Sequence, residues 1–487
     1  MEARGVVSRA HDEVTVGGGD GSIAGPVAAR PAVAARTRVL LDGPVAPTLL
    51  RLAAPNVLVM VLQVAVSTLD AVFVGWLGAD ALAGVSLVFP LAMLMQTMSA
   101  GGMGGGVASA VARALGAGRR EEADALAAHA IAIALGMAAL FTVVLLAAGP
   151  VLYRGMGGGG GTLAAALAYS HVFFGGAVTI WLYNIVGAVV RGTGNMALPA
   201  AVMVANAAIY LALSPALVMG WGPFPRLGIA GAATASIASY ALGALALIAY
   251  LLSGRSLVRL AVAGARPRWE RFYEILRVGA PGSLNTILTN LTIILVTGLV
   301  GPFGAPALAG YGMGARLEYL QIPLVFGLGA ALVTMVGTNV GAGRVARAQH
   351  VAWVGAGLAA AVTGTVGLLG ALWPEVWLGL FSADAAVLAT GTAYLRLVGP
   401  TYAFFGLGLA LYFASQGAGT LLWPLLAGFV RLTLAAGGGW FVVHWLGGGL
   451  SGLFAVLAVA LVTFGTINAL AVRLGAWRSA GPGGTPR

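Results

Sequence analysis

One acidic side chain lies inside an apolar stretch near the start of the chain. Asp70 is well separated from the charged Arg51, and most residues between them are Val, Leu and Met. Gln63, Ser67 and Asp70 are spaced 4 and 3 residues apart, which predicts a polar stripe on one face of a helix. A carboxylate in such a stripe can carry a proton, or hold Na⁺ if oxygen ligands surround it; a purely structural hydrogen bond is the alternative.

A second polar stripe is expected to face this carboxylate. Asn206, Tyr210 and Ser214 follow one another at intervals of four residues. We expect Asp70, Ser67, Tyr210, Ser214, Asn206 and Ser236 to form an ion-coupling site. Pro215 follows directly and is expected to interrupt the helix, which would free backbone carbonyl groups for an ion or substrate path. Interhelical hydrogen bonding alone is the other interpretation of the stripe.

Other polar residues inside apolar segments are assigned to a substrate cavity. They are Gln63, Glu318, Arg431, Asn285 and Thr289. Arg316 and Glu318 are two positions apart on a helix, so they point to different faces and are not expected to pair. Glu318 and Arg431 each have a structural alternative, as partners of neighbouring helices.

The composition of the chain indicates that membrane-spanning helices hold these residues in position. The chain of 487 residues is 59% hydrophobic and 8% charged, against roughly 25% charged residues in soluble domains. Apolar runs of about 20 residues recur, and in lipid such runs must be helices because the backbone has to satisfy its own hydrogen bonds. The absence of cysteine excludes disulfides and thiol chemistry. Twelve spans are predicted: 46–76, 82–106, 123–148, 163–190, 197–220, 228–253, 273–300, 307–338, 350–373, 385–415, 422–446 and 450–474.

The arginines predict the orientation. The chain has a net charge of +11, and all of its basic side chains other than histidine are arginines because the sequence has no lysine. Most of these arginines fall in the loops on one side of the predicted spans. The opposite side holds only Arg154 and Arg226. Because positively charged loops stay inside, both termini are expected to be cytoplasmic, in a multi-pass protein of the inner membrane. The basic charge therefore does not indicate nucleic-acid binding.

An internal repeat relates the two halves. Gly116-Ala117-Gly118-Arg119 recurs as Gly341-Ala342-Gly343-Arg344, and Ala168-Tyr169 recurs as Ala393-Tyr394, both at an offset of 225 residues. Six spans per copy give the two copies the same orientation, around an axis along the membrane normal. The expected organisation is a disordered tail over 1–43, an N-lobe over 44–253, a cytoplasmic linker over 254–272, a C-lobe over 273–474 and a tail over 475–487.

Several short motifs resemble the multidrug and toxic compound extrusion (MATE) family of transporters. They share the order and spacing of that family and are Pro55 followed by Asp70-Ala71-Val72-Phe73-Val74-Gly75, Gly116-Ala117-Gly118, Arg191-Gly192-Thr193-Gly194-Asn195, Leu213-Ser214-Pro215, Gly228-Ile229-Ala230-Gly231 and Gly337-Thr338-Asn339-Val340-Gly341. The resemblance implies an all-α membrane protein of twelve helices in a V-shaped pair of six-helix bundles. It also implies that Asp70 is the coupling carboxylate of the N-lobe.

The resemblance implies a secondary active efflux antiporter for amphipathic or cationic compounds. The sequence contains no HExxH motif, no nucleotide-phosphate loop and no Cys/His cluster, so neither enzymatic activity nor a cofactor or resident metal is expected. The protein is expected to act as a monomer. Members often carry Asp where this chain has Ser214, and Asn where it has Tyr210. These departures remove two ligands of a Na⁺ site, so H⁺ is favoured over Na⁺ at Asp70, as in the DNA-damage-inducible-type branch. A flippase for a lipid-linked precursor and a Na⁺-coupled exporter are the alternatives.

Overall fold

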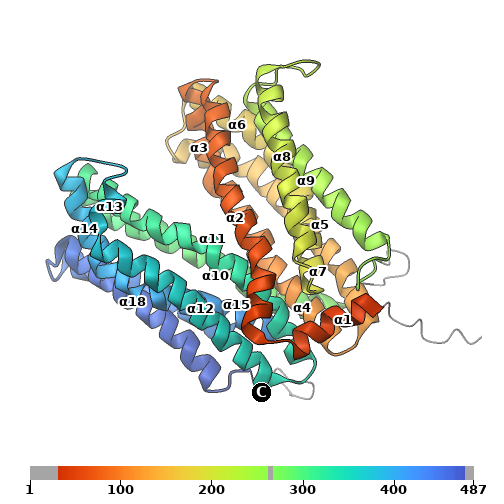
Figure 1. Ribbon diagram of the computed structural model, residues 1–487. Helices are drawn as coiled ribbons and strands as arrows, with labels where there is room; N and C mark the ends of the chain where they lie inside the picture. The colour runs from red at the N-terminus through yellow and green to blue at the C-terminus, as the bar shows by residue number, and fades with distance from the viewer. Residues whose placement is uncertain (1–30, 261–266, 478–487) are drawn as a thin grey trace, which may run out of the picture.

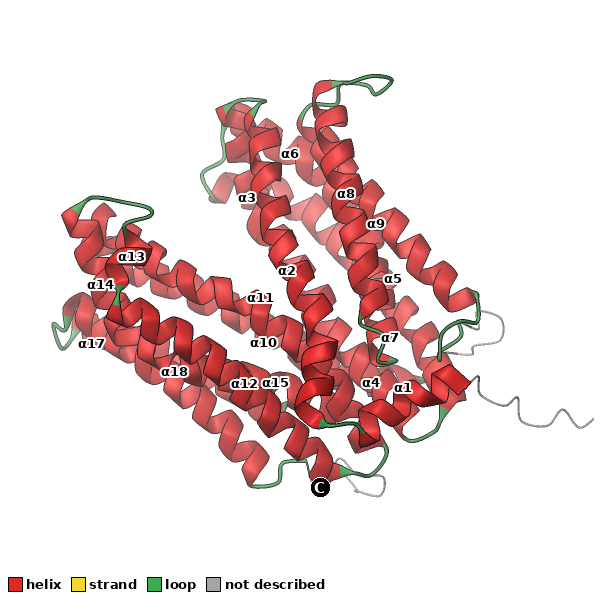
Figure 2. Ribbon diagram, in the orientation of Figure 1, coloured by secondary structure: helices red, strands yellow, loops and turns green. Residues whose placement is uncertain are grey.

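The computed structural model describes residues 31–260 and 267–477. Within these ranges every regular element is a helix (Figure 2). The first half contains α1 (Pro31–Asp42), α2 (Val45–Gly75), α3 (Ala79–Thr97), η1 (Met98–Met103), α4 (Gly104–Gly116), α5 (Arg120–Gly155), α6 (Gly160–Gly175), α7 (Ala177–Gly192), α8 (Ala197–Met219) and α9 (Ile229–Leu252). The second half contains α10 (Trp269–Val300), η2 (Gly301–Phe303), α11 (Ala305–Gly341), α12 (Val345–Leu372), α13 (Pro374–Leu378), α14 (Ala385–Val398), η3 (Gly399–Thr401), α15 (Tyr402–Ala418), α16 (Leu422–Leu432), η4 (Thr433–Gly438), α17 (Gly439–His444) and α18 (Gly449–Arg473).

The helices have the length and apolarity of a multi-pass membrane protein. In the described part of the chain, ten helical segments can cross a membrane, and α6 and α7 form an eleventh if the bent pair is one span. The range 46–76 coincides with α2, which is 31 residues long. Each of the twelve predicted ranges therefore coincides with a helix or a series of helices.

Two bundles form a V (Figure 1). We call α2–α9 the N-lobe and α10–α18 the C-lobe. The lobes pack together at the end that carries α1 and the C-terminal end of α18, and diverge toward the other end (Figure 1). We call these the closed end and the open end. The closed-end contact is made by α4 against α10, α11 and α15, while α2 packs on α11 and α8.

Four spans are not continuous α-helices, and one of them is α14–α15, which the 3-10 turn η3 interrupts at Gly399–Thr401. The helix axis turns by 47° between α6 and α7, at Gly175 and Gly176. Single π-helical turns interrupt two others, at η1 in the N-lobe and η4 in the C-lobe. Such turns often mark functional sites, because the extra residue redirects the side chains that follow.

The structure differs from expectation at three places. Residues 31–42 of the expected disordered tail form α1, whose Leu40 is buried against the bundle. Helix α8 continues through Pro215 to Met219, because packing in a multi-helix bundle can accommodate a proline that would break an isolated helix. Trp477, in the expected C-terminal tail, is buried and donates to the hydroxyl of Ser415.

Candidate functional site

Asp70 and Tyr210 meet inside the N-lobe, although they are 140 positions apart in the chain. The Tyr210 hydroxyl on α8 donates a hydrogen bond to Asp70 Oδ1 on α2. Val66, one helical turn before Asp70, packs with Tyr210, Leu217 and Ala235 in a small apolar cluster. The carboxylate therefore lies between three helices, with one strong donor and apolar walls.

Three further predicted residues lie on the same elements. Ser214 follows Tyr210 by one turn of α8, and its hydroxyl is fully buried without a hydrogen-bond partner among the described atoms. The amide of buried Asn206 lies against Gly243 of α9, where an added Cβ would collide with it. Ser236 is half-buried on α9. The side chain of Ser67 lies outside the described residues.

A tyrosine that was not predicted completes this site. Tyr169 on α6 is buried and stacks on Phe173, with ring centroids 5.6 Å apart. It lies close enough to Asp70 for the carboxylate charge to act on its hydroxyl. The internal repeat contained the signal, because Tyr169 is equivalent to Tyr394.

A second polar cluster lies in the C-lobe. The Tyr394 hydroxyl on α14 donates to Glu318 Oε2 on α11, at 3.1 Å. Arg431 on α16 is buried, and its guanidinium lies 5.3 Å from the ring centroid of Phe464. Its charge acts on Glu318, but the two groups form no ion pair within 4.0 Å. The arrangement is a carboxylate and a guanidinium that are near each other but do not pair.

The other predicted cavity residues join neither cluster. Gln63 is exposed on α2. Asn285 on α10 lies against Gly428, whose added Cβ would be 2.6 Å from Asn285 Oδ1. The Thr289 hydroxyl donates to the Asn285 carbonyl of its own helix, at 2.9 Å. Arg316 points away from Glu318, and its guanidinium lies 5.6 Å from the ring centroid of Phe381.

Comparison with known proteins identifies this architecture. The family model MatE matches residues 55–216 and 281–441, which cover α2–α8 and most of the C-lobe. The chain belongs to the MATE family of transporters.

Individual members support the assignment. The chain is 29% identical over 385 residues to a protein of Shewanella oneidensis called FAD transporter, covering 77% of this chain and 82% of that protein. It is 30% identical to the probable multidrug resistance protein YoeA of Bacillus subtilis, covering 72% and 76%. A crystal structure described as MATE in the bent conformation superposes with a TM-score of 0.84 at 25% identity, covering 91% of this chain and 98% of that one.

A polar network, also not predicted, runs through the N-lobe of this MATE transporter. The Gln96 amide on α3 donates to the Tyr240 hydroxyl on α9. Asn184 Nδ2 on α7 donates to Gln96 Oε1 at 3.0 Å and to Ser99 Oγ at 2.8 Å. Ser99 lies in the π-helical turn η1, and no sequence pattern indicated that turn.

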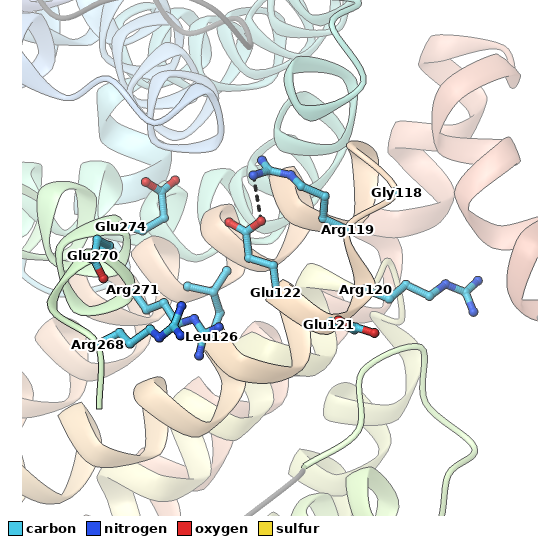
Figure 3. Close-up of a pocket in the computed structure, with 10 residues that line it drawn as sticks. All are labelled: Gly118, Arg119, Arg120, Glu121, Glu122, Leu126, Arg268, Glu270, Arg271 and Glu274. Atoms are coloured by element: carbon cyan, nitrogen blue, oxygen red, sulfur yellow. Dashed lines mark ion pairs between the residues drawn. The ribbon is translucent and has the colours of Figure 1, made fainter. Parts of the chain in front are cut away.

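A charged cavity of about 850 Å³ lies at the closed end (Figure 3), and its lining contains no residue of either cluster. Its walls come from the α4–α5 turn and the start of α10, and its side chains include Arg119, Glu122, Arg271 and Glu274. Arg119 and Glu122 form an ion pair at 2.7 Å (Figure 3). In the described part of the chain, no group of three or more His, Cys, Asp or Glu side chains could hold a metal ion.

Proposed function

We propose that this MATE transporter is a proton-coupled exporter of amphipathic or cationic organic compounds, with Asp70 as the residue that gains and loses the proton. The observation that carries the proposal is the position of Asp70. Its carboxylate lies inside the N-lobe, is half-buried, and has one hydroxyl donor from another helix. Carboxylates inside membrane helices are costly, and proton relays are among their main uses.

Protons fit this site better than Na⁺. A Na⁺ site needs several oxygen ligands, and the ligands offered beside Asp70 are hydroxyl groups, not a second carboxylate. Tyr210 donates a hydrogen bond to Asp70, so the carboxylate already has a hydroxyl partner without a cation. Asp70 is the single carboxylate of the predicted ion-coupling site, and this also supports placing the chain in the DNA-damage-inducible-type branch.

Two lobes that move against each other would supply the transport step. We assign the N-lobe to residues 44–253 and the C-lobe to residues up to 474, and α10 begins at Trp269, so the C-lobe takes in the last four residues of the predicted linker, which ends at 272. The arginine-rich loops lie at the closed end, and the positive-inside rule then places that end and both termini in the cytoplasm. The structure would accordingly be an outward-facing state of a monomeric transporter.

The C-lobe cluster is the proposed substrate contact. Glu318 would attract a cationic group, and its neighbour Arg431 would attract an anionic one. Relatives named as multidrug resistance proteins favour varied organic substrates. The relative named FAD transporter, together with buried Arg431, favours a second candidate, an anionic flavin compound.

The test is transport by purified protein in liposomes. Asp70→Asn keeps the size of the side chain but cannot be deprotonated. We expect wild-type protein to move ethidium when a pH gradient is imposed, and Asp70→Asn to lose this activity while folding normally. Glu121→Gln, which removes an exposed carboxylate at the closed end, is the matched control and should be unaffected.

Separate gradients distinguish the alternatives. Movement driven by Na⁺ alone would assign Na⁺ coupling to the same site. Full activity of Asp70→Asn under a pH gradient would remove Asp70 from the mechanism. Transport of FAD in place of ethidium would favour the anionic substrate class.

A further inference from the structure

Helices α4 and α11 cross at the closed end through pairs of small residues. Ala112 and Gly116 are spaced four residues apart on α4, and Gly337 and Gly341 have the same spacing on α11. An added Cβ at Gly116 would collide with the Thr338 carbonyl, and one at Gly341 with the Arg113 carbonyl. Small residues at this spacing let two membrane helices approach backbone to backbone.

This crossing obeys the internal repeat. Ala112 and Gly116 are equivalent to Gly337 and Gly341 at the offset of 225 residues, as Arg113 is to Thr338. The two steric contacts are thus one contact repeated around the pseudo-two-fold axis. Each lobe contributes the same small-residue surface to the other.

Two hydroxyl groups repeat the symmetry. Ser109 on α4 donates to the carbonyls of Gln416 and Gly417 on α15, the latter at 3.0 Å. Its equivalent on α11, Thr334, donates to the Arg191 carbonyl on α7, at 3.0 Å. Both hydroxyls are fully buried, and Arg191 and Gln416 are themselves equivalent residues. Each lobe therefore donates one hydroxyl to a helix end of the other.

The space left between the lobes here is small. A cavity of about 40 Å³ lies between α4, α7, α11 and α15, and Arg191 and Gln416 both line it. By this measure one water needs roughly 10–15 Å³, so the space holds a few waters and no organic solute. The crossing therefore blocks passage of an organic solute.

One interlobe ion pair has no counterpart in the repeat. Arg113 Nη2 on α4 pairs with Glu274 Oε1 on α10 at 2.8 Å, and Arg277 pairs with the same oxygen at 2.7 Å. The equivalent of Arg113 is Thr338, whose hydroxyl bonds only within its own helix. Glu274 also lines the charged cavity at the closed end, where separated charges can be solvated (Figure 3).

We propose that the α4–α11 crossing is the gate that closes the transport path at this end, with Ser109 and Thr334 as the positioning residues that hold it shut. The proposal rests on transport by lobe movement but not on the identity of the coupling ion. Opening would separate backbones that now touch and expose both hydroxyls to water. Opening would also part buried Arg113 from Glu274, whose carboxylate lines the charged cavity and keeps Arg277 as a partner.

The chain has no cysteine, so engineered disulfides can test the gate without background. An added Cβ at Gly337 lies 3.0 Å from Ala112 Cβ, across the lobes. An added Cβ at Gly364 also lies 3.0 Å from Ala403 Cβ, but within the C-lobe. Disulfides have Cβ atoms about 3.5–4.5 Å apart, so each pair needs a similar small adjustment. The variants are Ala112→Cys with Gly337→Cys, and the control Gly364→Cys with Ala403→Cys.

We expect oxidation to abolish ethidium transport by the interlobe pair and reduction to restore it, while the control pair transports in both states. Undiminished transport by the oxidised interlobe pair, with the disulfide verified by mass spectrometry, would overturn the gate.

A second measurement needs no substrate or ion gradient. Ala112→Cys and Ala410→Cys place a thiol at two positions with no exposed surface, one in the gate and one inside the C-lobe. In detergent, a polar maleimide should label the thiol in the gate at least about tenfold faster than the thiol inside the C-lobe. The reason is that an open conformation populated at about 0.1–10% would expose the gate thiol to the reagent and leave the C-lobe thiol buried. Equal labelling rates at the two positions would overturn the gate. If the rates differ but wild-type protein shows no proton-driven transport of ethidium, only the proposed role of Asp70 would be contradicted.

The hydroxyls have a matched control in the same assay. Adding Ser109→Ala to Ala112→Cys should raise its labelling rate further, because an interlobe hydrogen bond is lost. Ser239→Ala removes an equally buried hydroxyl that bonds only its own helix, to Ala235 at 2.8 Å, and should leave the rate unchanged. A Ser109 variant with an unchanged rate would remove the positioning role.

Discussion

The Tyr394 hydroxyl on α14 donates a hydrogen bond to Glu318 Oε2 on α11, at 3.1 Å. The equivalent tyrosine of the N-lobe, Tyr169, lies beside the other intramembrane carboxylate, Asp70. The carboxylates themselves are not equivalent, because Asp70 is on the first span of its lobe and Glu318 on the second. The duplication has thus kept the tyrosine and placed an acid near it from a different helix in each lobe.

Substitution of the C-lobe charges should change selectivity in opposite directions. Glu318→Gln leaves Arg431 without a nearby anion, so binding of cationic ethidium should weaken and binding of an anion should strengthen. Two unit charges about 10 Å apart at an effective dielectric constant of about 20 interact by about 1.7 kcal/mol, or more than tenfold in affinity. Arg431→Gln should produce the reverse order.

The measurement is the KM for ethidium and for an anionic dye in liposomes. Tyr394→Phe is the matched control, because it removes the hydrogen bond to Glu318 and keeps both charges. Parallel changes for the two dyes in Glu318→Gln would show that the cluster is structural only.

Removal of the Tyr210 hydroxyl tests how far Asp70 depends on its partner. A hydrogen bond to a charged group contributes about 1.5–3 kcal/mol. We therefore expect Tyr210→Phe to reduce proton-driven transport by about tenfold or more, but less than Asp70→Asn, which removes the titratable group. Initial rates of ethidium movement at matched protein density measure both variants, and equal rates for Tyr210→Phe and wild type would contradict a role for this bond.

Much of the fold could be predicted from the sequence, because in lipid the length of an apolar run determines a helix. The spans, the repeat and the two polar stripes that carry Asp70 and Tyr210 followed from spacing. Contacts between distant helices did not. Nothing in the sequence near Glu318 indicates that Tyr394, 76 positions away, would donate to it.

Other features depend on packing that spacing does not encode. The repeat of Gly116 as Gly341 was recognised from the sequence, but the close contact of each glycine with the opposite lobe depends on how the lobes meet. The π-helical turn at η1 changes the register of its span, so Ser99 reaches Asn184 in a way that a regular helix would not predict. Helix α1 forms where an isolated short helix would be marginal, because the C-lobe binds its end.

The attachment of α1 to the C-lobe should be insensitive to pH in the physiological range. Arg344 Nη1 donates to Asp42 Oδ1 at 2.6 Å, and this hydrogen bond holds the pKa of Asp42 below its ordinary value of 3.8. A lowered carboxyl pKa stabilises the folded state above the unfolded pKa, and the effect is lost as the pH falls through the folded pKa. The difference in unfolding temperature between wild type and Asp42→Asn should therefore stay constant from about pH 5 to 8 and shrink only below about pH 4.

A spin-label distance between α1 and α12 checks the same contact directly. If the difference in unfolding temperature between wild type and Asp42→Asn changed between about pH 5 and 8, another titrating group would be acting at the contact between α1 and the C-lobe.

The symmetry of the gate predicts that two distant substitutions have the same consequence. Gly116→Ala and Gly341→Ala each add a methyl group that collides with a backbone carbonyl of the opposite lobe, and a carbonyl cannot move aside as a side chain can. Both variants should open the closed end and raise maleimide labelling at Ala112→Cys by a similar factor. Gly357→Ala, on α12, adds the same methyl group where nothing lies within 4 Å, and should label like the parent. A large effect from one gate glycine and none from the other would mean that the two contacts do not act as symmetric halves of one gate.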